Sequence, residues 1–120
     1  FQQFVCVYSF LPEFYNQNKY RLLGPDGEWG ELRDNYVTHE RLVDACLAHN
    51  TTDRLKDITI PTLVIHAAKD MVTSPRTTLP IEYGIPGADG VTMENTAHVV
   101  AGRAQKIEFC NILFSFLDKH

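Results

Sequence analysis

The sequence predicts an α/β fold in which a helical region precedes two parallel strands and their helices. Apolar residues recur at helical spacing from Phe1 to about Thr52. From Asp57 onward the period changes, and the run "TLVIHAA" is nearly continuous in apolar, often β-branched residues, as in a parallel strand covered on both faces. Residues 53–120 then read strand, helix, strand, helix, which is typical of the end of an α/β sheet.

Residues 1–52 are predicted to contain several helices. Two apolar faces support this prediction: Phe4, Tyr8, Leu11 and Tyr15, and later Leu42, Val43, Cys46 and Leu47. Pro12 should break or kink the first helix, since proline cannot donate a backbone hydrogen bond. The stretch "GPDGEWGE" predicts a loop, and Asn50 with the following "TTD" predicts a helix stop.

In residues 53–120, Ser74 is the expected N-cap of a helix with Pro75 at its first position, and Pro80 should keep that helix short or bent. "VTMEN" is the second strand candidate, and residues 101–120 form a closing amphipathic helix. The apolar face of this helix contains Ile107, Cys110, Leu113, Phe114 and Leu117. Two parallel strands do not make a stable sheet, so further strands are expected from sequence before Phe1 or from another chain.

Composition excludes several classes of function. The chain has 120 residues, 44% of them hydrophobic, and a formal net charge of −4 without blocks of like charge, so no nucleic-acid or membrane-surface partner is indicated. No apolar run approaches the ~20 residues of a membrane-spanning helix. The cysteines are odd in number, far apart and in apolar surroundings, which predicts neither disulfides nor a metal site and favours a reducing, cytoplasmic compartment. No cofactor is expected. The absence of an initiator methionine hints that the gene product begins before Phe1.

Two polar residues follow the two predicted strands. Asp70 comes after the first strand and His98 after the second, and sites in open α/β sheets gather at the carboxyl ends of strands. A carboxylate that orients an imidazole base forms the proton-handling part of a catalytic triad. The alternative for Asp70 is an ordinary strand-end turn, and for His98 a structural histidine. His66, inside the first strand, is expected to pack or bond a carbonyl rather than to react.

These segments resemble the α/β-hydrolase superfamily over roughly residues 53–120. The resemblance rests on "DRLKDITIPTLVIHAAKD", "GIPGAD" and "TAHVV" occurring in that order. It implies that residues 53–120 are the C-terminal part of the hydrolase core, with its last two parallel strands, and that residues 1–52 are a helical cap. Asp70 would be the triad acid and His98 the triad base. Ala67 and Ala97 stand where the family commonly has glycine.

The nucleophile of such a triad is not recognisable in this sequence. Ser9, Ser74 and Ser115 lack the G-x-S-x-G setting on a strand-to-helix turn, so the nucleophile is expected before Phe1 or on a partner chain. A cysteine nucleophile at Cys46 is the less favoured alternative to a small buried side chain.

The resemblance implies a hydrolase of small apolar carboxylic esters, thioesters or lactones. Acyl transfer, lyase chemistry or C–C bond cleavage on the same fold stays open, as does a non-catalytic ligand-binding member. Substrate contacts are expected from Trp29, Met71 and Val99. The cap aromatics should pack together, with a few lining an apolar pocket: Phe4, Tyr8, Phe10, Phe14 and Tyr15.

Overall fold

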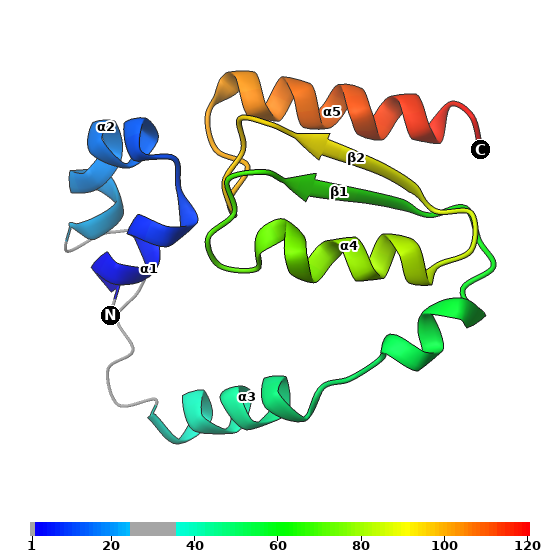
Figure 1. Ribbon diagram of the computed structural model, residues 1–120. Helices are drawn as coiled ribbons and strands as arrows, with labels where there is room; N and C mark the ends of the chain where they lie inside the picture. The colour runs from blue at the N-terminus through cyan, green and yellow to red at the C-terminus, as the bar shows by residue number, and fades with distance from the viewer. Residues whose placement is uncertain (1, 25–35) are drawn as a thin grey trace.

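The computed structural model describes residues 2–24 and 36–120 of the chain. The structure contains a two-stranded sheet. Figure 1 shows that it lies between helices, with further helices beyond it. The strands β1 (Leu63–Ala67) and β2 (Asp89–Met93) pair in parallel, with Leu63 opposite Asp89 and Ala67 opposite Met93. The predicted α/β class and the order strand, helix, strand, helix are therefore confirmed, although β2 begins earlier than "VTMEN".

The sheet is covered on its two faces by the helices that follow its strands. Helix α4 (Ser74–Gly84) packs against β1, and α5 (Arg103–Leu117) packs against β2 from the opposite face (Figure 1). Side chains alternate between faces along a strand, so His66 points toward α4 and is buried, whereas its neighbours on β1 are half-buried. Helix α5 begins after Gly102, whose φ of 89° lies in the left-handed region that favours glycine.

The start of α4 corrects one expectation. Thr73, not Ser74, is the residue at the N-cap, and Ser74 is the first helical residue, ahead of Pro75. The Thr73 side chain makes no capping bond because its hydroxyl donates to Asp70 instead. Pro80 lies inside this 11-residue helix, as predicted.

The helices of the N-terminal region confirm the predicted break at Pro12. Helix α1 (Gln2–Ser9) ends before it, and α2 (Pro12–Leu23) begins with it. The two helices pack around a small core of Cys6, Phe10 and Leu22, against which Val99 and Ala101 also lie. Of the five aromatic side chains expected to pack together, only Phe10 is buried, at 6% exposure. Phe14 and Tyr15 are partly buried in this core, whereas Phe4 is 67% exposed.

Helix α3 (Tyr36–Ala48) and the short 3-10 helix η1 (Thr52–Asp57) complete the described elements. The helix stop predicted near Asn50 is confirmed, since α3 ends at Ala48. The predicted apolar face of α3, however, is exposed: Leu42, Val43, Cys46 and Leu47. Of the three cysteines, Cys6 is buried, whereas Cys46 and Cys110 are exposed. No helix in residues 2–24 or 36–120 is long and apolar enough to cross a bilayer.

Candidate functional site

The candidate site lies at the carboxyl ends of β1 and β2, where two loops are hydrogen-bonded to each other. The Ala68 N–H donates to the Met93 carbonyl (3.1 Å), which extends the strand pairing by one step. The Lys69 N–H then donates to the Thr96 carbonyl (3.0 Å), and its Nζ donates to Oδ1 of Asn95 (3.0 Å). Because the strands are parallel, both loops leave the sheet at the same edge, and their following residues are brought together.

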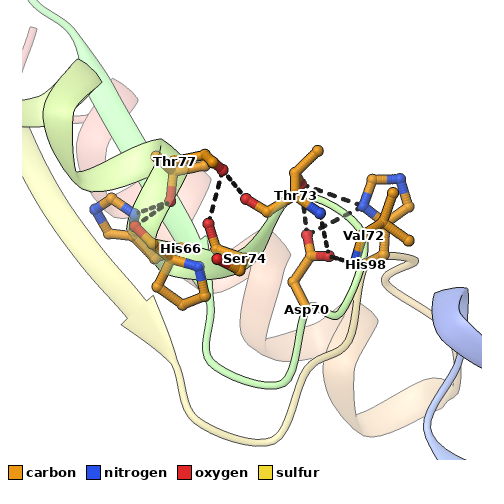
Figure 2. Close-up of polar contacts among 9 residues, drawn as sticks. His66, Asp70, Val72, Thr73, Ser74, Thr77 and His98 are labelled. Atoms are coloured by element: carbon orange, nitrogen blue, oxygen red, sulfur yellow. Dashed lines mark hydrogen bonds and ion pairs between the residues drawn. The ribbon is translucent and has the colours of Figure 1, made fainter.

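Asp70 and His98 form a hydrogen-bonded pair at this edge. Oδ2 of Asp70 lies 3.0 Å from Nδ1 of His98 (Figure 2), and the side chains are 11% and 36% exposed. Because a carboxylate can only accept a hydrogen bond, Nδ1–H of His98 is the donor. The opposite ring nitrogen, Nε2, is thereby left as the proton acceptor of the neutral ring. The structure thus brings together the two residues that the sequence singled out.

Asp70 is held by its own loop as well as by His98. Oδ1 accepts the backbone N–H groups of Val72 (2.7 Å) and Thr73 (2.9 Å), and Oδ2 accepts the Thr73 hydroxyl (2.8 Å). These bonds to the residues just downstream are those of a polar turn, so the strand-end turn expected as the alternative and the His98 contact occur together. The carboxylate therefore has a single orientation with both oxygens bound.

The electrostatics of this turn keep Asp70 ionised. Partial burial by itself raises the pKa of Asp70, but the Thr73 N–H, His98, the Thr73 hydroxyl and the Val72 N–H outweigh burial. Together they lower the pKa from 3.8 to about 2, because each bond favours the charged form. At neutral pH the group next to the imidazole is consequently a carboxylate.

The loop of His98 is held from the other side by helix α1. The Val99 N–H donates to the carbonyl of Ser9 (2.9 Å), the last residue of α1, and Ser9 is 1% exposed. Ala97, on the other side of His98, is also buried. Val99 is half-buried: it packs against the α1–α2 core and also lines a separate cavity of about 720 Å³, and its backbone bond helps to place the histidine.

An apolar cavity of about 410 Å³ opens beside His98. Its lining consists of Phe4, Val5, Tyr8, Ser9, Met71, Val72 and His98. Met71, expected as a substrate contact, is 65% exposed and lies on this cavity. Val99 does not line it. Trp29, the third expected contact, lies outside the described residues, as does most of the predicted glycine-rich loop. The cavity places an apolar surface of α1 and of the Asp70 loop next to the imidazole.

The serines of the chain occupy helical positions. Ser9 ends α1 and Ser115 lies in α5, whereas Ser74 is the first residue of α4, at the end of the loop from β1, and has a φ of 21°. None of the three lies in a G-x-S-x-G sequence. In the parts of the chain that the structure describes, no three His, Cys, Asp or Glu side chains cluster to hold a metal ion.

One polar network near the site was not found by sequence reasoning. His66 is 2% exposed, with Nδ1 2.7 Å from Oγ1 of Thr78 and Nε2 2.6 Å from Oε2 of Glu82. The expectation that His66 would pack or bond a carbonyl missed both partners, which lie on α4. The i, i+4 spacing of Thr78 and Glu82 was the available signal, because it places them on one helix face.

Comparison with known proteins adds no relative. No family model matches the chain, and no curated protein sequence is significantly similar to it.

Proposed function

We propose that Asp70 and His98 are the acid and base of a Ser-His-Asp triad in an α/β-hydrolase-type enzyme acting on small apolar carboxylic esters, thioesters or lactones. The nucleophile is supplied from outside residues 1–120, by a longer chain or a partner chain. The observation that carries this proposal is the 3.0 Å contact between Asp70 Oδ2 and His98 Nδ1 at the shared carboxyl end of two parallel strands. The motifs "PTLVIHAAKD" and "TAHVV", which deliver these residues, add to it.

The geometry suits the division of labour in a triad. The bond from Nδ1–H to Asp70 fixes the tautomer in which Nε2 accepts the proton of a hydroxyl nucleophile. As the oxygen of the nucleophile bonds to the substrate carbonyl carbon, the imidazole becomes a cation that the ionised Asp70 stabilises. His98 then returns the proton to the leaving alcohol or thiol as the carbonyl–heteroatom bond breaks. Water attacks the acyl enzyme through the same two proton transfers.

The surroundings of His98 support an apolar substrate. Phe4, Val5 and Tyr8 of α1 face Met71 and Val72 of the Asp70 loop across the cavity beside the imidazole. Ligand sites are typically apolar clefts with a few placed polar groups, and the polar residues that line this one include His98. A short acyl or alkyl group fits this description better than a charged one.

The test combines turnover with labelling of the nucleophile. The complete protein, including the longer chain or partner chain that supplies the nucleophile, is assayed on p-nitrophenyl acetate and butyrate. Its intact mass is measured after exposure to a serine-directed fluorophosphonate. We expect hydrolysis and one adduct in the wild type, a loss of about 10⁴-fold in kcat for Asp70→Asn, and a loss approaching about 10⁶-fold for His98→Ala. His49→Ala, at an exposed histidine just beyond α3, is the matched control and should keep both activities.

Other results would assign other functions. Unchanged turnover in His98→Ala would overturn the proposal. Saturable binding of these esters without hydrolysis or adduct would point to a ligand-binding protein. Product formation that requires an added alcohol as acceptor would instead indicate acyl transfer.

A further inference from the structure

A second histidine–carboxylate pair lies near the candidate site, between β1 and α4. His66 is on β1, four residues before Asp70, and both of its ring nitrogens have partners on α4. Because a carboxylate can only accept, Nε2–H donates to Oε2 of Glu82 at 2.6 Å, while Nδ1 contacts the Thr78 hydroxyl at 2.7 Å. With His66 2% and Glu82 23% exposed, this network joins strand and helix in largely buried surroundings.

The neighbouring strand β2 leaves space for the Glu82 side chain. Gly90 on β2 pairs with Val64 of β1, and a methyl group added at Gly90 would overlap the carboxyl group of Glu82. The absence of a side chain at this position therefore lets Glu82 reach across to His66. An alanine there would displace the carboxylate while leaving His66 and Glu82 themselves unchanged.

The two residues of α4 that bind His66, Thr78 and Glu82, lie on either side of a proline that interrupts the helix. Pro80 stands inside the helix between Thr78 and Glu82, and proline there removes one helical hydrogen bond and crowds the preceding turn. The backbone of α4 alone thus holds its two halves together less firmly than an uninterrupted helix would. Thr78 and Glu82 fasten one half each to the same imidazole.

Hydrogen bonds continue from this helix to the candidate site. The hydroxyl of Thr77 donates to the carbonyls of Thr73 and Ser74, which ties the first turn of α4 to the loop before it (Figure 2). Thr73 in turn donates its N–H and hydroxyl to Asp70, and Asp70 accepts from His98. A shift of α4 along β1 would therefore move Thr73, and with it the orientation of the carboxylate.

We propose that His66, Thr78 and Glu82 form a positioning network that fixes α4 on β1 and thereby holds Asp70 in the orientation in which it binds His98. The three are positioning residues, since none of them contacts the Asp70–His98 pair. The consequence for catalysis rests on the proposed function, but the consequence for Asp70 does not.

The test measures Asp70 directly in the full protein. The carboxyl carbon of Asp70 is titrated by ¹³C NMR in the wild type, Glu82→Ala, Glu82→Gln and Gly90→Ala. Glu108→Ala, at an exposed glutamate on α5, is the control. We expect a pKa of about 2 in the wild type and control, and a rise toward 3.8 in Glu82→Ala and Gly90→Ala. Glu82→Gln should stay nearer the wild type, because its amide can still bond His66.

Kinetics give an independent measurement. If the proposed esterase activity is present, Glu82→Ala and Gly90→Ala should lower kcat by about 10–100-fold with little change in KM, as expected of a misplaced catalytic group. A raised Asp70 pKa in a protein without esterase activity would support the network and reject the hydrolase proposal.

A wild-type Asp70 pKa in folded Glu82→Ala and Gly90→Ala would overturn the inference, and the network would then merely attach α4. Should those variants fail to fold, Thr78→Val removes one tether at nearly constant volume. The same criterion then decides: a raised Asp70 pKa supports the network, and an unchanged one rejects it.

Discussion

Replacing Asp70 by asparagine should make the stability of the fold less dependent on pH. Asparagine keeps an oxygen that can accept the N–H groups of Val72 and Thr73, but it has no charge and its amide faces the Thr73 hydroxyl and His98. The folded wild type lowers the pKa of Asp70 from 3.8 to about 2. The stabilisation is therefore fully present above the unfolded value and is lost as the pH falls through about 2.

The size of this effect follows from the two pKa values. At ~1.4 kcal/mol for each tenfold change in acid constant, the interval between 3.8 and about 2 corresponds to roughly 2–3 kcal/mol in the free energy of unfolding. Urea unfolding of wild type and Asp70→Asn should thus differ by about 2–3 kcal/mol near neutral pH. The gap should narrow through the acid range toward pH 2. Asp57→Asn, at an exposed aspartate ending η1, is the control. A gap that stays constant over this range would refute the reasoning.

Three further changes test other parts of the site. Thr73→Val removes the hydroxyl that binds Asp70, so NMR titration should find the Asp70 pKa above its wild-type value of about 2; an unchanged value would contradict the assigned hydrogen bond. Leu22→Ala empties a side chain that is 1% exposed, and calorimetry should find a cost of about 2–5 kcal/mol, whereas a cost below ~1 kcal/mol would mean that the small helical core is not packed as described. Phe4→Ala removes one wall of the cavity beside His98, so KM for apolar esters should rise with kcat nearly constant; a fall in kcat alone would argue against a binding role.

The pairing of Asp70 with His98 was predictable because each step of the inference was local. An apolar strand followed by a polar residue is visible in a short window, and parallel pairing then places the two strand ends at one edge. The motif resemblance indicated which strands pair. The break at Pro12 was predictable for a similar reason, since proline acts on its own backbone.

The partners of His66 were beyond this kind of reasoning. Glu82 lies in a helix that mixes polar and apolar residues, where a glutamate usually faces water. Only the orientation of α4 against β1 turns its side chain inward, toward His66. The space that it needs comes from Gly90, a residue whose sequence context indicates a turn rather than a strand. The prediction of a buried apolar face on α3 was wrong for a related reason. The periodicity of its apolar residues predicts a buried face but does not specify the surface that would cover it.

The two members of the candidate site are supported by different parts of the molecule. Asp70 is oriented by its own loop and by α4, which His66 attaches to the sheet. His98 is placed by the bond from Val99 to the end of α1 and by the small core of α1 and α2 behind it. The 3.0 Å contact between them therefore depends on the position of the helical N-terminal region relative to the sheet. The hydrogen bond from Val99 to the Ser9 carbonyl therefore links α1, which forms one wall of the apolar cavity, to the loop that carries His98.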